Sequence, residues 1–222
     1  MGTYIEIPFD QTTLRAYETM PKGSGPFPAL VAVQEWWGLN QNIVNIADRL
    51  TSDGYLVLAP DLYEGSVADD SAEAQRLNGL YAASAPAKCM AAYDALFARD
   101  DVRKIGCIGW CMGGRMSLHL AVNQPALDAA VIFYGRPEQY FGQIADIECP
   151  VLGLFGEKDE SIPVARVKQL RQELEAAGVP HEIVVYPGAD HAFFNESHHT
   201  YHPEAAADAW ERTLRFLDKY LA

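Results

Sequence analysis

The sequence has no apolar stretch long enough to cross a membrane. Its longest apolar runs, such as 29–33 and 129–134, are a few residues long, whereas a membrane-spanning helix needs about 20. The N-terminus also lacks the basic segment followed by an apolar one that marks a secretory signal, because Glu6 interrupts the first apolar stretch. These two absences predict a cytoplasmic protein with no membrane partner.

Basic residues are scarce: 17 Lys and Arg stand against 30 Asp and Glu, which gives a net charge of −13. The basic residues are scattered and form no arm or stripe. Such a charge balance disfavours binding to nucleic acids and to acidic membrane surfaces. The expected partner is therefore a small molecule, and an anionic one would need a local cation to offset the overall field.

The four cysteines include no C-x-x-C pair, which argues against a zinc or thioredoxin-type site. Without a secretory context a disulfide is not expected either, and Cys107 and Cys149 fit the role of small buried apolar residues. His198 and His202 have an i, i+4 spacing that suits a metal, but no neighbouring carboxylate or cysteine completes a site. We therefore expect a solvated loop there, and a protein without metal or cofactor.

Short apolar runs alternate with longer amphipathic ones along the chain. The predicted strands are 3–8, 14–20, 29–34, 55–59, 104–109, 128–134, 151–155 and 181–186. The predicted helices are 42–52, 71–83, 87–98 (after Pro86), 113–122, 164–177 and 203–221. This alternation predicts an α/β fold in one domain over 1–222, with a mostly parallel sheet of about eight strands and helices on both faces. In such folds the site lies at the carboxyl ends of the strands.

The segment 109–114, Gly-Trp-Cys-Met-Gly-Gly, lies where a buried strand is followed by a helix. It contains G-x-C-x-G, the cysteine version of the nucleophile elbow. A nucleophile in such a strained turn needs small residues two before and two after it, and Gly109 and Gly113 meet that need. The turn would also place the sulfur of Cys111 at a helix N-terminus, where free N–H groups favour a thiolate.

A cysteine nucleophile needs a base, and the base needs a group that fixes its tautomer. Asp159 and His191 each follow an apolar strand, and their order after Cys111 is nucleophile, acid, histidine. Glu157 or Glu160 could replace Asp159, whereas Asp190 is poorly placed to contact the ring of the histidine next to it.

Several segments together resemble the dienelactone hydrolase (carboxymethylenebutenolidase) family of α/β-hydrolases. They are Gln-Glu-Trp-Trp-Gly-Leu-Asn at 34–40, Ala-Pro-Asp-Leu-Tyr at 59–63, Gly-Trp-Cys-Met-Gly-Gly at 109–114, Gly-Glu-Lys-Asp at 156–159 and Gly-Ala-Asp-His-Ala-Phe at 188–193. The likeness runs from about residue 28 to the C-terminus. It implies a Cys111, Asp159 and His191 triad, with Glu35 contacting the resting thiol and the N–H groups of Met112 and Trp36 forming the oxyanion hole.

The sequence matches the substrate-binding residues of the family less completely than the catalytic ones. Arg76 matches an arginine that holds a substrate carboxylate in dienelactone enzymes. Leu80 stands where the family has a tyrosine, with Tyr81 displaced by one, and Asn195 stands in place of a second arginine. We expect the other pocket residues to be aromatic, namely Trp36, Trp37, Tyr134 and Phe194.

The resemblance implies a hydrolase that cleaves a carboxylic ester or lactone through a thioester on Cys111, in a monomer or small homo-oligomer. Two alternatives stay open. One is another hydrolytic reaction at the same site. The other is an α/β-hydrolase relative that has lost catalysis and serves as a ligand-binding module.

Overall fold

The computed structural model describes residues 2–222 and consists of one sheet with helices packed on it. The strands are β1 (Thr3–Phe9), β2 (Thr12–Thr19), β3 (Phe27–Val33), β4 (Leu56–Pro60), β5 (Val102–Trp110), β6 (Ala129–Phe133), β7 (Val151–Gly156) and β8 (His181–Tyr186). Their spatial order is β1-β2-β4-β3-β5-β6-β7-β8. β2 pairs antiparallel with both β1 and β4, and all other neighbours are parallel.

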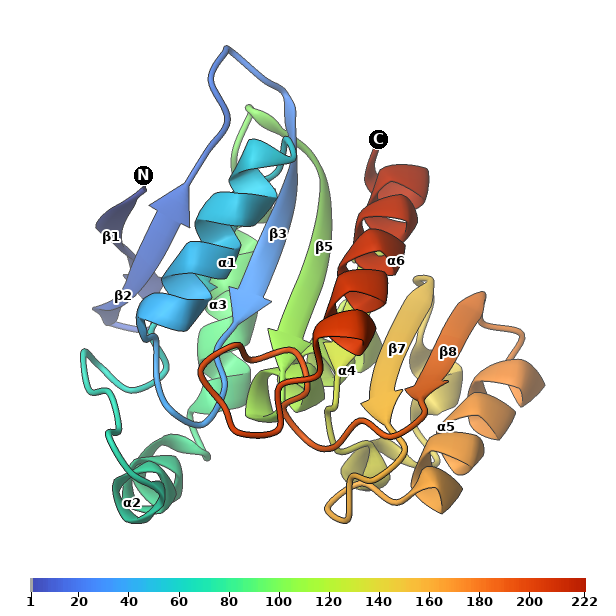
Figure 1. Cartoon of the computed structure of the whole chain (residues 1–222). Coiled ribbons are helices and arrows are strands. Elements are labelled where there is room, and N and C mark those ends of the chain that lie inside the picture. Colours follow the sequence, from blue (N-terminus) through green and yellow to red (C-terminus); the bar gives the residue numbers. More distant parts are fainter. Residues whose placement is uncertain (1) are drawn as a thin grey trace.

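Helices cover both faces of this sheet (Figure 1). They are α1 (Gln41–Ser52), α2 (Ser71–Tyr81), α3 (Ala85–Phe97), α4 (Met112–Asn123), α5 (Val164–Ala176) and α6 (Pro203–Leu221), with short 3-10 turns η1 (Glu138–Tyr140) and η2 (Ile144–Asp146). Figure 1 shows α1 and α6 in front of the sheet and α3 and α4 behind it. No helix among residues 2–222 is long and apolar enough to cross a membrane.

The buried strands explain the layered arrangement. Every residue of β4, β6 and β7 is buried, as expected for parallel strands covered on both sides. Along the edge strand β1 only Ile7 is buried, and most other residues are exposed. Asn40 caps α1, because its side chain accepts a hydrogen bond from the N–H of Ile43, and the helix turns one buried apolar face toward the sheet. The predicted α/β fold is thereby confirmed.

The predicted element boundaries agree with the structure to within a few residues. One difference concerns Pro86, which was expected to separate two helices but lies inside the first turn of α3. Proline is compatible with this position because the first N–H groups of a helix have no partner within it. The 3-10 turns η1 and η2 were not predicted, since three residues carry no readable periodicity.

Because β3, β5, β6, β7 and β8 are parallel, their carboxyl ends lie at the same end of the sheet, as Figure 1 shows for β3, β5, β7 and β8. A polar or reactive residue follows each of these strands. These residues are Glu35 after β3, Cys111 after β5, Tyr134 after β6, Asp159 after β7 and His191 after β8. The parallel topology therefore gathers residues that are far apart in the sequence.

Candidate active site

Cys111 occupies a strained turn between β5 and α4. Its backbone has φ +54° and ψ −113°, a combination that non-glycine residues rarely adopt. Two hydrogen bonds hold the turn: the N–H of Cys111 donates to the carbonyl of Phe133 at 3.0 Å, and the N–H of Arg115 donates to the carbonyl of Cys111 at 3.2 Å. Strain of this kind costs about 1–3 kcal/mol and persists where the surrounding structure enforces it.

The glycines around Cys111 allow backbone segments to pack directly against each other, with no room for a Cβ atom. A Cβ atom at Gly109 would lie 2.1 Å from the carbonyl oxygen of Gly113, and one at Gly113 would lie 2.1 Å from that of Val33. A Cβ at Gly114 would come within 2.5 Å of the Phe133 oxygen. The expected need for small residues on both sides of the turn is confirmed, and the third glycine lets α4 approach β6.

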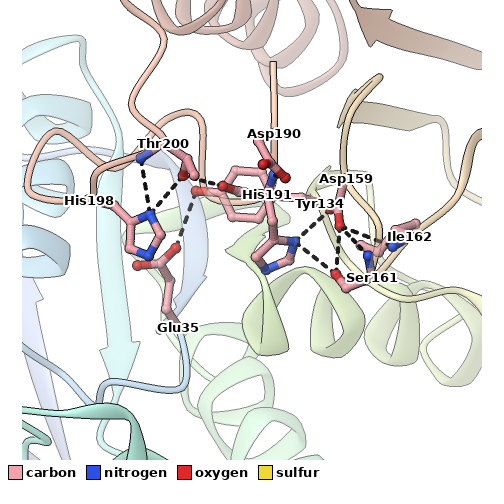
Figure 2. A network of polar contacts seen from close by, with 9 residues as sticks. All are labelled: Glu35, Tyr134, Asp159, Ser161, Ile162, Asp190, His191, His198 and Thr200. Carbon is pink, nitrogen blue, oxygen red and sulfur yellow. Dashed lines mark hydrogen bonds and ion pairs between the residues drawn. The ribbon is translucent and has the colours of Figure 1, made fainter. Parts of the chain in front are cut away.

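His191 is joined to Asp159 by a hydrogen bond of 2.6 Å between Nδ1 and Oδ2 (Figure 2). Burial alone would lower the pKa of His191, but the hydrogen bond with Asp159 and the proximity of Cys111 outweigh it and raise that pKa to about 10. The neighbouring carboxylate, Asp190, accepts from the backbone N–H of His191 and does not contact the ring. Among the acids considered, Asp159 is the one that orients the imidazole.

Asp159 is itself fixed by three donors besides His191. Its Oδ1 accepts hydrogen bonds from the N–H and the hydroxyl of Ser161, at 2.8 and 2.6 Å, and from the N–H of Ile162 at 3.0 Å (Figure 2). Burial would raise the pKa of Asp159, but these bonds and His191 lower it overall. The carboxylate is therefore ionised at neutral pH and able to stabilise a positive charge on the ring.

Glu35 is buried at the cavity wall and bonded to neutral groups. Its Oε2 accepts a hydrogen bond of 2.7 Å from Nδ2 of Asn195, and its Oε1 accepts one of 3.3 Å from the hydroxyl of Tyr134. Burial raises the pKa of Glu35, and these two bonds together with the charge of His191 offset part of that rise. No hydrogen bond within residues 2–222 links Glu35 to Cys111, so the resting contact that the resemblance implies is replaced by a contact with Asn195.

The functional side chains open onto a cavity of about 450 Å³. Its wall is formed by residues from the strand ends and from α2, α4 and the loop before α6. They are Glu35, Trp36, Trp37, Ser71, Asn78, Cys111, Met112, Arg115, Tyr134, Arg136, Ser161, His191, Ala192 and His198. This volume is in the range of small-molecule sites.

Trp36 and Met112 both line this cavity. Met112 is the first residue of α4, so its N–H has no partner within the helix. Across the described chain neither N–H donates a hydrogen bond to another protein group, which leaves both available to an oxygen bound next to Cys111.

Four of the residues expected to bind substrate do not line the cavity. The guanidinium of Arg76 is 58% exposed on α2 and pairs with Glu73 through two hydrogen bonds of 2.7 Å. Tyr81 stacks on Tyr63 at the end of α2, and Phe194 is buried between Trp110 and Trp210. Asn195 is buried as well and acts on Glu35 rather than on the cavity.

His198, Arg115 and Arg136 line the cavity but were not predicted to do so. His198 is half-buried, not solvated as expected for its loop, and its Nδ1 lies 2.7 Å from the hydroxyl of Thr200. That hydroxyl in turn donates to the carbonyl of His191 (Figure 2). Burial, together with the nearby histidines, lowers the pKa of His198. The only sequence signal was the histidine-rich stretch itself.

Within residues 2–222 no three His, Cys, Asp or Glu side chains are arranged to hold a metal ion. Cys111 is half-buried, and the other three cysteines are buried and unpaired. A cysteine in a strand–helix elbow, a histidine and an oriented aspartate, in this chain order on a mostly parallel eight-stranded sheet, define an α/β-hydrolase.

Comparison with known proteins agrees with this class. The sequence profile of the Dienelactone hydrolase family matches residues 14–221. A protein of Escherichia coli strain K12 is 36% identical over 98% of this chain and 86% of its own length; its assigned name, carboxymethylenebutenolidase, is provisional. The chain therefore belongs to the dienelactone hydrolase family.

Solved structures support the same conclusion. A provisionally assigned dienelactone hydrolase from Klebsiella pneumoniae has a TM-score of 0.88 and 34% identity, with 99% of both chains covered. A dienelactone hydrolase-like promiscuous phosphotriesterase from metagenomic libraries also has a TM-score of 0.88, at 26% identity, over 100% of this chain and 99% of its own.

Proposed function

We propose that this protein hydrolyses a carboxylic ester or lactone through a thioester on Cys111. The observation that carries the proposal is the juxtaposition of Cys111, held in a strained elbow at the cavity, with His191 and its 2.6 Å hydrogen bond to Asp159. Family membership and the names of the relatives supply the ester or lactone as the substrate class.

Before acylation, the imidazole of His191 would hold the proton that it shares with Cys111, because the pKa of His191 is raised to about 10. The sulfur attacks the carbonyl carbon, and the N–H groups of Met112 and Trp36 stabilise the oxygen that becomes negative. As the C–O bond to the alcohol breaks, His191 donates its proton to the leaving oxygen. The products of this half-reaction are the alcohol and a thioester.

Deacylation would reverse the proton movements. Neutral His191 takes a proton from water, the hydroxide attacks the thioester carbonyl, and the C–S bond breaks to release the carboxylic acid. Asp159 stabilises the imidazolium in both half-reactions and keeps the ring in one orientation. No step requires a cofactor. We further propose that the protein works in the cytoplasm, as a monomer or small homo-oligomer, on small molecules and without nucleic acid or membrane.

The test is turnover of a neutral aryl ester, 4-nitrophenyl acetate, by the wild-type protein and by Cys111→Ala. We expect the wild type to release nitrophenol catalytically and the variant to be reduced to background, with unchanged circular dichroism. A wild type that labels at Cys111 with iodoacetamide but hydrolyses no ester would instead indicate a different hydrolytic reaction. A wild type that neither labels nor hydrolyses would favour a ligand-binding module.

A further inference from the structure

The loop between His191 and α6 folds back on the turn that carries His191. We propose that Thr200 and His198, two residues of that loop, form a brace that holds this turn and thereby aims the imidazole of His191 at Cys111. Both are positioning residues, and their role depends on the chemistry proposed for His191. In Figure 2, dashed lines join His198 to Thr200 and Thr200 to the carbonyl of His191.

The turn after His191 contains a strained residue. Ala192 has φ +59°, in the left-handed region that residues with a side chain seldom occupy, and it is buried at the cavity wall. This conformation costs about 1–2 kcal/mol, so the turn would relax unless neighbouring groups enforced it. A relaxed turn would rotate the peptide group between His191 and Ala192 and displace the imidazole.

Hydrogen bonds from the loop hold the peptide groups on both sides of Ala192. On the N-terminal side, the hydroxyl of Thr200 donates to the carbonyl of His191. On the C-terminal side, the N–H of Asn195 donates to the carbonyl of Ala192 at 2.9 Å. Thr200 is therefore the side chain that fixes the carbonyl of His191, and a substitution can remove that contact.

His198 determines where the proton of the Thr200 hydroxyl points. A hydroxyl has one proton and a carbonyl oxygen has none, so the contact between Thr200 and the carbonyl of His191 uses that proton. The 2.7 Å contact between Nδ1 of His198 and Oγ1 of Thr200 then needs its proton on the ring nitrogen. The N–H of Thr200 also approaches Nδ1, but at 3.4 Å this contact is too long to compete. His198 therefore donates to Thr200 and directs its hydroxyl to His191.

The backbone around His198 holds its ring against Thr200. The N–H of His198 donates to the carbonyl of Asn195 at 2.9 Å, and the carbonyl of His198 accepts from the N–H of Tyr201 at 3.0 Å. Asn195 is itself bonded to Glu35. The brace is thus connected to the loops after β3 and β8, which carry Glu35 and His191.

The first measurement is the rate at which iodoacetamide alkylates Cys111 as a function of pH, because this rate reports the thiolate and needs no ester substrate. Thr200→Val keeps the shape of the side chain and removes the hydroxyl. Since a displaced imidazolium stabilises the thiolate less, we expect the midpoint of the profile to rise by at least about 0.5 pH unit. The kcat for 4-nitrophenyl acetate should fall roughly 10–100-fold, with KM changed less than about twofold. Thr200→Ser should restore most of both.

Thr51→Val is the matched control. Thr51 is also half-buried, and its hydroxyl donates to the backbone carbonyl of a distant segment, that of Thr19 at 3.2 Å. The alkylation profile and kcat of Thr51→Val should equal those of the wild type. If Thr200→Val lowers stability in urea but leaves the alkylation profile and kcat unchanged, Thr200 only stabilises the loop and the proposal is refuted.

Two substitutions separate the brace from a direct action of His198 on the substrate. In His198→Asn an amide nitrogen can take the place of Nδ1, whereas in His198→Gln the amide reaches toward the place of Nε2 and Thr200 loses its donor. We expect His198→Gln to shift the alkylation profile in the same direction as Thr200→Val, and His198→Asn to shift it less. The opposite order would overturn the role assigned to His198.

The strain at Ala192 provides a test by double-mutant cycle. Glycine adopts a positive φ without strain, so in an Ala192→Gly background the turn depends less on the brace. The loss of kcat caused by Thr200→Val, in logarithmic units, should therefore be less than about half as large in that background as in the wild type. An equal loss in the two backgrounds would contradict the proposal.

The alkylation profiles also separate the brace from the proposed function. If no ester is hydrolysed but the profiles shift as expected in Thr200→Val and His198→Gln, the brace stands and the proposed function fails. If esters are hydrolysed while kcat and the alkylation profile are insensitive to both substitutions, the function stands and the brace is refuted.

Discussion

Asn195 donates a 2.7 Å hydrogen bond to Glu35 across a separation of 160 residues in the sequence, and both side chains are buried. The bond joins the loop after β3 to the loop that follows His191. It gives the carboxyl of Glu35 a neutral partner, since Tyr134, its other partner, is also neutral. Glu35 is thus a buried acid with no cation bonded to it, which makes its ionisation costly.

Replacing Glu35 by glutamine should change how stability depends on pH. The folded-state pKa of Glu35 is raised, so the stability that its protonation contributes is full below the unfolded value of about 4.5 and is lost as the pH rises through the folded value. Glu35→Gln does not titrate. We therefore expect urea denaturation to show that the variant gains stability relative to wild type between pH 4.5 and pH 8.

Glu160→Gln serves as the control for that measurement, because Glu160 is an exposed carboxylate close to the same site. A constant stability difference between Glu35→Gln and wild type over this pH range would show that burial does not perturb this carboxyl.

Asp159→Asn should remove the acceptor that fixes His191. The pKa of His191, raised to about 10 in the wild type, should fall in the variant, as followed by NMR titration of its ring. In the wild type, the stability linked to protonation of His191 is full below about pH 6.5 and is lost as the pH rises toward 10. The loss of stability over this pH range should therefore be smaller in the variant. We expect kcat for an aryl ester to fall by roughly 10³–10⁴.

The matched control is Asp190→Asn, since Asp190 bonds only the backbone N–H of His191 and asparagine retains an acceptor oxygen. Its effect on kcat should be below tenfold. Comparable losses in the two variants would mean that Asp159 has no special role in orienting the ring.

Gly113→Ala should destabilise the protein and distort the elbow. The added methyl would lie 2.1 Å from the carbonyl oxygen of Val33, so backbone must move; we expect a loss of at least about 2–3 kcal/mol in the free energy of unfolding. Gly79→Ala is the control, because Gly79 is exposed on α2 with no atom within 4 Å of the added carbon. It should be neutral or stabilising by up to about 1 kcal/mol. Equal stability of the two variants, by urea denaturation, would contradict the packing argument.

The strands, the helices and the residues that follow each strand were predictable because they depend on local patterns. Buried parallel strands read as apolar runs, and in parallel topology the residues after them converge at one edge. That reasoning located Cys111, Asp159 and His191 with their chain order.

The remaining wall residues depend on packing between distant segments, which the sequence does not display. Arg115 and Arg136 both line the cavity because Gly114 packs against Gly135. Arg76, which the family resemblance indicated, is turned by its helix toward Glu73 and solvent. The partner of Glu35 was not predictable either, since Asn195 contacts it only in the folded protein.

The most direct test of the account is rapid-quench mass spectrometry of the wild-type protein mixed with 4-nitrophenyl acetate. We expect the protein to gain one acetyl group, which peptide mapping places on Cys111 and which forms and decays fast enough to explain the turnover. Steady hydrolysis without such an adduct, or an adduct that maps elsewhere and persists in Cys111→Ala, would contradict it.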